Sequence, residues 1–287
     1  MLEQFISKFS RNLFIIPGGY YLVKFFIKIF SLKNYSKNSW RTYEFQGLVF
    51  KVDIHTYLGK LMYWRGAHEW GPILAMKKII KSGGICIDVG ANQGEYTLWM
   101  AKLSSDSGKV ISFEPLTKMY NQLIENIDLN PNLSQKIITI KKGLSDHVSE
   151  LPLYAVNASD NNSDNEGMPS IFHSDTRNTF IENIALSTLD IELKKMNINK
   201  VNFIKIDVEG AELLVLKGAA DTLNKSKPNL LIEFNEQTFN AAGYTSNDIF
   251  NFLEPFGYRF YIIGIRGNLK ACNKNSIPPF CNIIATI

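Results

Sequence analysis

An acidic residue and two glycines stand at the end of an apolar run in the first third of the chain. Asp88 lies in the run 85–89, and Gly90 and Gly94 follow it. Glycines let a backbone turn approach a ligand closely and adopt dihedral angles that side chains disfavour. The run predicts a buried parallel strand, and the apolar spacing after Gly94 predicts a helix. We therefore expect a nucleotide-like ligand at this strand–helix turn.

The spacing of the turn excludes two common nucleotide-binding motifs. The dinucleotide pattern G-x-G-x-x-G would need glycines at the positions of Asn92 and Glu95. A phosphate-binding P-loop would need a lysine directly after Gly94, where this chain has Glu95. Asp88 and Glu95 would repel a pyrophosphate, whereas they suit a ligand with a cationic amino acid part. S-adenosylmethionine combines such a part with one adenosine, and we expect it as the cofactor.

Two later turns are expected to meet the same ligand. Glu114 ends a second predicted strand and could accept both hydroxyls of a ribose, and Pro115 then favours the start of a helix. After a third strand, Ser145 or Asp146 could hydrogen-bond the adenine amino group, or both could belong to an ordinary turn. The expected cofactor-binding residues are Asp88, Gly90, Ala91, Asn92, Gly94, Thr97, Glu114, Pro115, Ser145 and Asp146.

A second acidic cluster follows the apolar run 203–206. Asp207 lies at the tip of this predicted strand, and Glu209 and Glu212 follow in the first turn of a helix. Acids favour a helix N-terminus, but a cap does not need this much negative charge. The three could hold a divalent cation, one could be a general base with a raised pKa, or they could bind polar substrate groups. Glu233 reaches the same rim from a later strand.

These motifs resemble, in their order, the FkbM family of S-adenosylmethionine-dependent methyltransferases. The D-x-G-x-x-x-G pattern of Asp88, Gly90 and Gly94 is similar to motif I of class I methyltransferases. The similar stretches are Ile-Asp-Val-Gly-Ala-Asn-Gln-Gly at 87–94, Phe-Glu-Pro at 113–115, Ser-Thr-Leu-Asp at 187–190, Ile-Lys-Ile-Asp-Val-Glu-Gly-Ala-Glu at 204–212, Leu-Lys-Gly-Ala at 216–219 and the approach at 63–69. The resemblance covers about 43–235 and weakly the rest. Many members have Glu-x-His on the fifth strand, where this chain has Glu233 and Asn235, and Asn235 cannot take a proton.

The resemblance implies an α/β, Rossmann-like class I methyltransferase fold. Its sheet would have seven mostly parallel strands with an antiparallel final strand, and helices on both faces. The implied activity is O-methylation of a hydroxyl on a sugar, glycan or related small molecule. Such a transfer needs the hydroxyl aligned with the methyl carbon and one proton removed. We expect Asp207 nearest the methyl group, with His68, Glu209 and Glu233 as candidate bases; His68 needs the least pKa tuning near neutral pH.

The first 42 residues differ from the methyltransferase domain expected at 43–287. Residues 1–46 carry seven basic and two acidic residues, a net +5, so the rest of the chain nets −1 within a total of +4. Amphipathic helices are expected at about 2–12 and 19–32. The stretch is too interrupted for a transmembrane span, and the lack of a small-residue cleavage site argues against a signal peptide. We favour packing on the main domain or self-association, and contact with an anionic membrane surface is the alternative.

Other classes of function are left open or excluded by the same observations. Nucleic acid is not expected as a partner, because the main domain is near neutral and lacks a basic stripe. A nicotinamide-dependent sugar-modifying enzyme would use the same fold, but the missing glycines count against it. A non-catalytic, membrane-associated cofactor-binding module is the third alternative. The polar loop 157–167 would suit a lid, and the cysteine usage indicates the cytoplasm, with the inner face of the membrane as an alternative.

Overall fold

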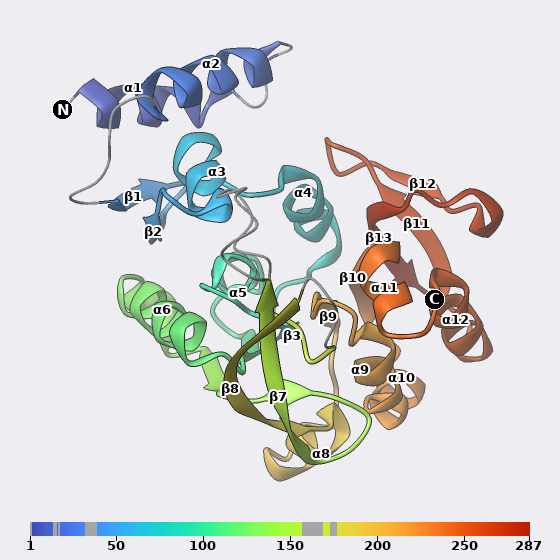
Figure 1. Ribbon diagram of the computed structural model, residues 1–287. Helices are drawn as coiled ribbons and strands as arrows, with labels where there is room; N and C mark the ends of the chain where they lie inside the picture. Colours follow the sequence, from blue (N-terminus) through green and yellow to red (C-terminus); the bar gives the residue numbers. More distant parts are fainter. Residues whose placement is uncertain (1, 14–15, 17, 32–38, 157–168, 173–176) are drawn as a thin grey trace. The chain divides into compact units, whose positions relative to one another are not determined.

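The computed structural model describes residues 2–13, 16, 18–31, 39–156, 169–172 and 177–287, which fall into two compact units (Figure 1). The first unit ends at Glu69, and the second begins at Trp70. The sequence placed a domain boundary after residue 42, whereas the first compact unit also includes the segment from there to Glu69. The polar loop expected at 157–167 lies outside the described residues.

The first unit combines two helices, a hairpin and a third helix. Its elements are α1 (Leu2–Ser10), α2 (Gly19–Ser31), β1 (Trp40–Phe45), β2 (Leu48–Asp53) and α3 (Tyr57–Arg65). The two helices expected from the sequence are confirmed. Alternation of apolar residues over 43–52 also predicts a strand or hairpin, which corresponds to β1 and β2, and α3 is an addition. Between β1 and β2, Gln46 and Gly47 both have positive φ, 49° and 70°. A two-residue hairpin turn of this kind matches the right-handed twist of its strands.

The second unit is built on an open α/β sheet, which within the described residues has eight strands. Their order is β12 (Leu269–Ala271), β11 (Arg259–Ile263), β13 (Phe280–Thr286), β10 (Asn229–Asn235), β9 (Phe203–Ile206), β3 (Ile85–Val89), β4 (Lys109–Phe113) and β5 (Ile137–Ile140). Strands β10, β9, β3, β4 and β5 are parallel, and β13 is antiparallel to β10 and β11. The predicted fold class is confirmed, and the short edge strand β12 adds one strand to the seven expected.

The order of the strands places a switch point between β3 and β9. From β3 the chain builds outward through β4 to β5, and it then returns to add β9 on the other side of β3. In open α/β sheets, ligands bind outside the carboxyl ends of the strands at such a switch point. We therefore expect the ligand-binding site among the residues that follow β3 and β9.

Helices cover both faces of the sheet, which is why the central strands are continuous apolar runs. They are α4 (Trp70–Ile79), α5 (Glu95–Leu103), α6 (Thr117–Asp128), α7 (Pro131–Ser134), α8 (Leu189–Lys195), α9 (Glu212–Lys217), α10 (Ala220–Ser226), α11 (Glu236–Ala241) and α12 (Ser246–Leu253), with 3-10 turns η2 (Glu254–Phe256) and η3 (Lys274–Ser276). Side chains alternate along each strand, so Ile87 packs in the core shared with α8, α9, α10 and α12, and Asp88 faces the opposite side, toward α5.

A three-stranded sheet is inserted between β5 and β9. Its order is β6 (Gly143–Leu144), β8 (Arg177–Ser187) and β7 (Ser149–Val156), and β7 and β8 form a long antiparallel pair. Glu182 of β8 accepts hydrogen bonds from the backbone nitrogen and the hydroxyl of Thr117, 2.7 and 2.5 Å away, and so caps α6.

Across both units, none of the helices in the described part of the chain is long and apolar enough to cross a membrane.

Candidate active site

The turn after β3 is fixed by close backbone contacts. Gly90 has φ 76°, and a Cβ atom there would lie 1.9 Å from the carbonyl oxygen of Asp207. The backbone nitrogens of Gly90 and Ala91 both donate to the carbonyl of Phe113, each at 3.0 Å. Gly94 has φ 90° at the start of α5. Glycine is therefore required at 90 because the backbone leaving β9 passes directly against the turn.

Asp88 is completely buried beneath this turn. Its Oδ2 accepts a hydrogen bond of 2.6 Å from Thr97 Oγ1, which also lies 2.8 Å from Ser112 Oγ. Asp88 and Thr97 both have no exposed surface, so the expectation that they contact the cofactor is corrected. Strand alternation turns Asp88 away from the rim and under α5. The pair instead joins β3 to α5 and thereby holds the turn between them in place.

Lys205 neutralises this buried carboxylate and connects it to the turn. Its Nζ donates to the Gly90 carbonyl at 2.9 Å and lies 3.6 Å from Asp88 Oδ1 and 3.3 Å from Asp207 Oδ2. The ammonium also lies 5.1 Å from the centre of the Tyr96 ring, in cation–π range. Burial lowers the pKa of Lys205, but the carboxylates of Asp207 and Asp88 outweigh that effect and raise it. The lysine is therefore charged, and it contacts the residues that follow both β3 and β9.

Sequence reasoning missed Lys205, although a signal was present. The lysine stands inside the apolar run 203–206, which was predicted to be buried on both faces. Lysines are almost never fully buried unless they are paired. A lysine in such a strand therefore indicates a buried carboxylate on a neighbouring strand.

The turn after β9 is unusual in its backbone. Glu209 has φ 53° and Gly210 has φ 103°. Glu212 accepts hydrogen bonds from the backbone nitrogens of Val208 and Gly210, both at 3.0 Å, and Tyr244 Oη lies 3.1 Å from its carboxylate. Burial raises the pKa of Glu212 to about 7, with the backbone hydrogen bonds opposing the shift. Positive φ at a glutamate is costly, and these contacts hold it.

The role expected for Glu212 is corrected by this geometry. One alternative was that it holds a divalent cation together with Asp207 and Glu209, but the turn directs its carboxylate back onto its own backbone. Among the described residues, the acidic group with the right spacing consists of Asp207, Glu209 and Glu233, whose nearest oxygens lie within 4.8 Å of one another. Three of the four acids expected at this rim are thus brought together, and all three are partly exposed.

Such a group of carboxylates supports two kinds of chemistry. Oxygen donors in this number fit a hard divalent cation, and a carboxylate beside an acceptor hydroxyl can take its proton. The ammonium of Lys205 already lies 3.3 Å from Asp207 and competes with a cation there.

Asn235, where the family pattern often has histidine, accepts a hydrogen bond of 3.1 Å from the backbone nitrogen of Gln237 and caps α11.

Glu114 bridges the first turn to the next one. Its Oε2 accepts from the backbone nitrogen of Asn92 at 2.8 Å, and its Oε1 accepts from that of Leu116 at 2.9 Å. Burial raises the pKa of Glu114 to about 7, and these two hydrogen bonds oppose the shift. Each carboxylate oxygen has a second lone pair, so the expected contact with a ribose stays a prediction. Pro115 lies between this carboxylate and the start of α6.

The two residues expected near the adenine differ in exposure. Ser145 is buried, and its backbone nitrogen donates to the Ser187 carbonyl at 2.8 Å. Asp146 is partly exposed, and its Oδ1 lies 2.6 Å from His147 Nδ1. Burial acts to raise the pKa of Asp146, but hydrogen bonds from His147 and Ser145 outweigh it and lower the pKa. Contact of either residue with adenine stays a prediction. The side chain of Asp146 is the more accessible of the two.

Two other motifs that carried the resemblance build the fold instead of a site. Asp190 accepts from the backbone nitrogens of Asp221 and Thr222, each at 2.9 Å, at the N-terminus of α10. A Cβ atom at Gly218 would lie 2.0 Å from the Ser145 carbonyl oxygen.

His68 belongs to the first unit, where its ring centre lies 6.2 Å from that of Tyr57. Its role as a base therefore stays a prediction.

Comparison with known proteins identifies related sequences. Residues 88–260 match the family model described as the methyltransferase FkbM domain. Methyltransferase sdnD of Sordaria araneosa is 28% identical over 176 residues, which cover 54% of this chain and 67% of that protein. Methyltransferase 1 of Beauveria bassiana is 25% identical over 157 residues, covering 51% of this chain and 63%, less than two thirds, of that protein.

Two solved structures also align with the chain. Methyltransferase FkbM from Methylobacillus flagellatus aligns with a TM-score of 0.48 and 14% identity, over 80% of this chain and 55% of that one. Fibrillarin from Aeropyrum pernix, in complex with natively bound S-adenosyl-L-methionine, aligns with a TM-score of 0.45 and 11% identity, over 87% and 83% of the two chains.

Proposed function

Because the chain belongs to the FkbM methyltransferase family, we propose that it transfers a methyl group from S-adenosylmethionine to a hydroxyl of a sugar, glycan or related small molecule. One observation carries the proposal. At the switch point of the sheet, a glycine turn and a partly exposed carboxylate group end adjacent strands, and one buried lysine, Lys205, contacts both. A donor site and an acceptor site at the ends of adjacent strands suit a direct transfer of the methyl group.

The cofactor fits the turn after β3 through the backbone more than through side chains. S-adenosylmethionine, when bound, supplies a methyl group already activated by its sulfonium. Gly90 and Gly94 both have positive φ, so glycine lets the backbone bend sharply here and pack against Asp207 and Leu123. Glu114 is placed to accept ribose hydroxyls with its remaining lone pairs. Lys205 cancels the charge of buried Asp88, so the negative charge that faces the ligand comes from the acids on the rim.

The carboxylates after β9 would orient and deprotonate the acceptor hydroxyl. Asp207 Oδ2 is engaged by the ammonium of Lys205 at 3.3 Å. This contact suits Asp207 to a fixed role in orienting the hydroxyl, and it leaves the proton to Glu209 or Glu233. The positive φ of Glu209 aims its side chain into the group that also contains the other two acids. The strained turn is therefore part of how we expect the base to be positioned.

A binding experiment tests the cofactor before the acceptor is known. Isothermal titration of the full chain with S-adenosylmethionine, and separately with NAD, should give binding to the former alone. Stabilisation by NAD without any response to S-adenosylmethionine would refute the proposal and favour a nicotinamide enzyme. Binding without transfer to any of a panel of sugar hydroxyls would favour a non-catalytic module.

Two substitutions and a chelator then assign the carboxylates. Glu209→Gln and Glu233→Gln should both keep the affinity for S-adenosylmethionine, and the substitution of the residue that acts as the base should lower kcat by about 10² to 10⁴. Removal of divalent cations with a chelator should leave the rate unchanged if the acids act by proton transfer alone. A rate lost on chelation and restored by Mg²⁺ would assign the group to a metal ion instead.

A further inference from the structure

Helix α1 is oriented opposite to an ordinary surface helix. An amphipathic helix of a globular protein normally buries its apolar stripe and exposes its polar side chains. In α1 the buried residues are Ser7 and Ser10, followed by buried Arg11 just after the helix, whereas Phe5 is 74% exposed and Phe9 55% exposed. The polar side of the helix thus faces the protein, and the apolar side faces outward.

The polar side is anchored by specific hydrogen bonds to the end of α3. Ser10 Oγ lies 2.6 Å from the Trp64 carbonyl, and Arg11 Nη1 donates to the Tyr63 carbonyl at 2.7 Å. These carbonyls belong to the last turn of α3, where a helix leaves them without intrahelical partners. The guanidinium of Arg11 lies 4.6 Å from the centre of the Tyr43 ring. The inverted orientation is therefore held by contacts that an apolar face could not make.

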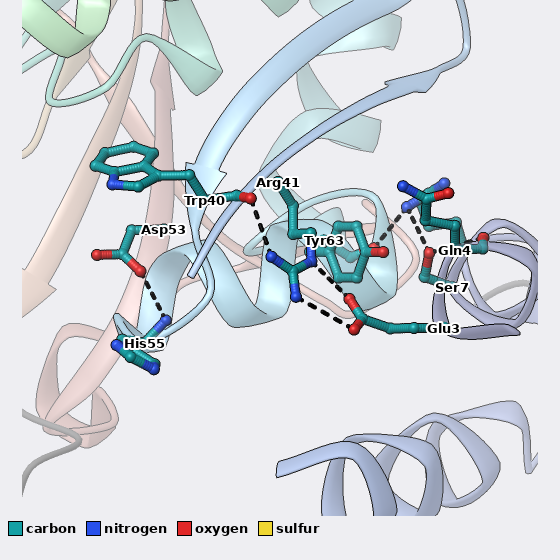
Figure 2. A network of polar contacts seen from close by, with 9 residues as sticks. Glu3, Gln4, Ser7, Trp40, Arg41, Asp53, His55 and Tyr63 are labelled. Atoms are coloured by element: carbon teal, nitrogen blue, oxygen red, sulfur yellow. Dashed lines mark hydrogen bonds and ion pairs between the residues drawn. The ribbon is translucent and has the colours of Figure 1, made fainter. Parts of the chain in front are cut away.

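An ion pair at the start of α1 fixes the same orientation. Glu3 Oε1 accepts from Arg41 Nε at 2.8 Å, and Glu3 Oε2 accepts from Arg41 Nη2 at 3.3 Å (Figure 2). Arg41 Nη1 also donates to the Trp40 carbonyl at 3.0 Å. The bidentate geometry holds the first turn of α1 against β1 by its one acidic residue. The pair also removes the acidic charge from the outward face.

Helix α2 also exposes large apolar side chains. Val23 and Phe30 are buried, whereas Tyr21 is 76% exposed and Phe25 56% exposed. We use the name outer face for the exposed large apolar residues of the two helices and the residue between them: Leu2, Phe5, Phe9, Ile16, Tyr20, Tyr21, Leu22, Phe25 and Ile29. Five of these nine are aromatic, as is common where a protein meets the interface of a bilayer.

The charges beside the outer face have a single sign. Of the charged residues described between 2 and 31, Lys8, Lys24 and Lys28 are exposed. Arg11 is buried, and Glu3 is paired with Arg41. The outer face is therefore apolar, rich in aromatic residues and accompanied by exposed cations alone. This combination complements a surface that has both hydrocarbon and negative charge.

We propose that the outer face docks on the surface of an anionic lipid membrane. The helices α1 and α2, of nine and 13 residues, would lie in the interface and not cross it, because a span needs about 20 residues. A second copy of the chain fits the same face less well. An isologous interface would bring the lysines of one copy toward those of the other, which is unfavourable.

Vesicle flotation of the full chain tests the proposal. We expect the protein to float with vesicles of phosphatidylcholine and phosphatidylglycerol, and not with phosphatidylcholine alone. Replacing the three exposed lysines by glutamine should weaken binding about 100-fold, at about fivefold for each charge. The double variant Phe5→Ser/Phe25→Ser should weaken it about tenfold for each ring removed. Ile265→Ser is the matched control, because Ile265 is 79% exposed but lies in the second unit, and it should bind like the wild type.

Three results would overturn the proposal. They are absence of flotation with anionic vesicles, flotation that the Phe5→Ser/Phe25→Ser variant retains, and a dimer in sedimentation velocity that this variant dissociates while no vesicle binding occurs. The last result would assign the outer face to a second copy. Both phenylalanines are exposed, so the variant should unfold at the wild-type temperature, and thermal unfolding confirms that a loss of binding is not a loss of folding.

Discussion

Replacing Lys205 by methionine tests whether its ammonium stabilises the fold by neutralising buried Asp88 and by donating to the Gly90 carbonyl. Methionine is unbranched and apolar like the stem of lysine, is one atom shorter, and removes the charge. Asp88 would then be a fully buried carboxylate whose Oδ1 has lost the ammonium 3.6 Å away, and the Gly90 carbonyl would lose its donor. Removing one partner of a buried pair typically costs about 3–5 kcal/mol. Both side chains are almost completely buried, so solvent screening does not reduce this figure.

The loss should depend on pH in a defined direction. Burial already raises the pKa of Asp88, and Lys205 opposes that shift. Without the lysine, the folded-state pKa of Asp88 rises further above its value in the unfolded chain. The variant then loses stability as the pH rises between these two values, at about 1.4 kcal/mol per pH unit for one proton. The cost of the substitution is therefore smaller near pH 5 than near pH 8, by roughly this slope.

Urea unfolding of the wild type and the variant at both pH values measures the effect. The double variant Lys205→Met/Asp88→Asn should recover much of the lost stability, because asparagine can still accept from Thr97 without a buried charge. Lys225→Met is the control, since Lys225 pairs with Asp221 at 3.0 Å on the surface and should change little. A Lys205→Met variant that resembles this control at both pH values would refute the reasoning.

Three further predictions concern the turns on which the site is built. Gly90→Ala should destabilise the fold and abolish S-adenosylmethionine binding in calorimetry, because its Cβ would lie 1.9 Å from the Asp207 carbonyl oxygen; Gly243→Ala, with φ 82° and no atom within 4 Å, should cost only the backbone strain of about 1–2 kcal/mol. If Glu114 accepts ribose hydroxyls, affinity for S-adenosylhomocysteine should rise with pH through its pKa of about 7, by at most about tenfold per unit below it, and Glu114→Gln should remove this dependence. Tyr244→Phe removes a hydroxyl 3.1 Å from Glu212 and 2.9 Å from the Gly210 carbonyl, and should cost about 1–3 kcal/mol in urea unfolding; a neutral effect would show that these contacts do not hold the turn.

The sequence predicted that the candidate site residues meet at one edge of the sheet, because strand ends can be recognised one strand at a time. The stretches 86–89, 110–113 and 203–206 are mostly apolar, with one polar residue each (Asp88, Ser112 and Lys205), which is typical of strands buried on both faces. Parallel strands bring their carboxyl ends to one edge, so the turns that follow them converge. Nothing about the pairing of the strands is needed for this step.

The contacts beneath the site depend on register, which the sequence does not show. Asp88 and Lys205 are direct neighbours across β3 and β9, although they lie far apart in the chain. Strand by strand, Asp88 was interpreted as a rim residue and Lys205 was not singled out. Glu212 was misplaced for a related reason. Two successive positive φ values at Glu209 and Gly210 reverse the chain, and the sequence at these positions predicts only a helix start.

The first helix shows the same limit for amphipathic patterns. Periodicity identified an apolar face in 2–12, and packing of that face on the main domain or on a second copy was the favoured expectation. Within the chain, Ser10 and Arg11 satisfy the last carbonyls of α3, so the apolar face stays outward. A hydrophobic pattern defines two sides of a helix, but the partners of the polar side decide which one is buried. The exposed apolar side chains and the exposed lysines are the observations from which we propose contact with an anionic surface.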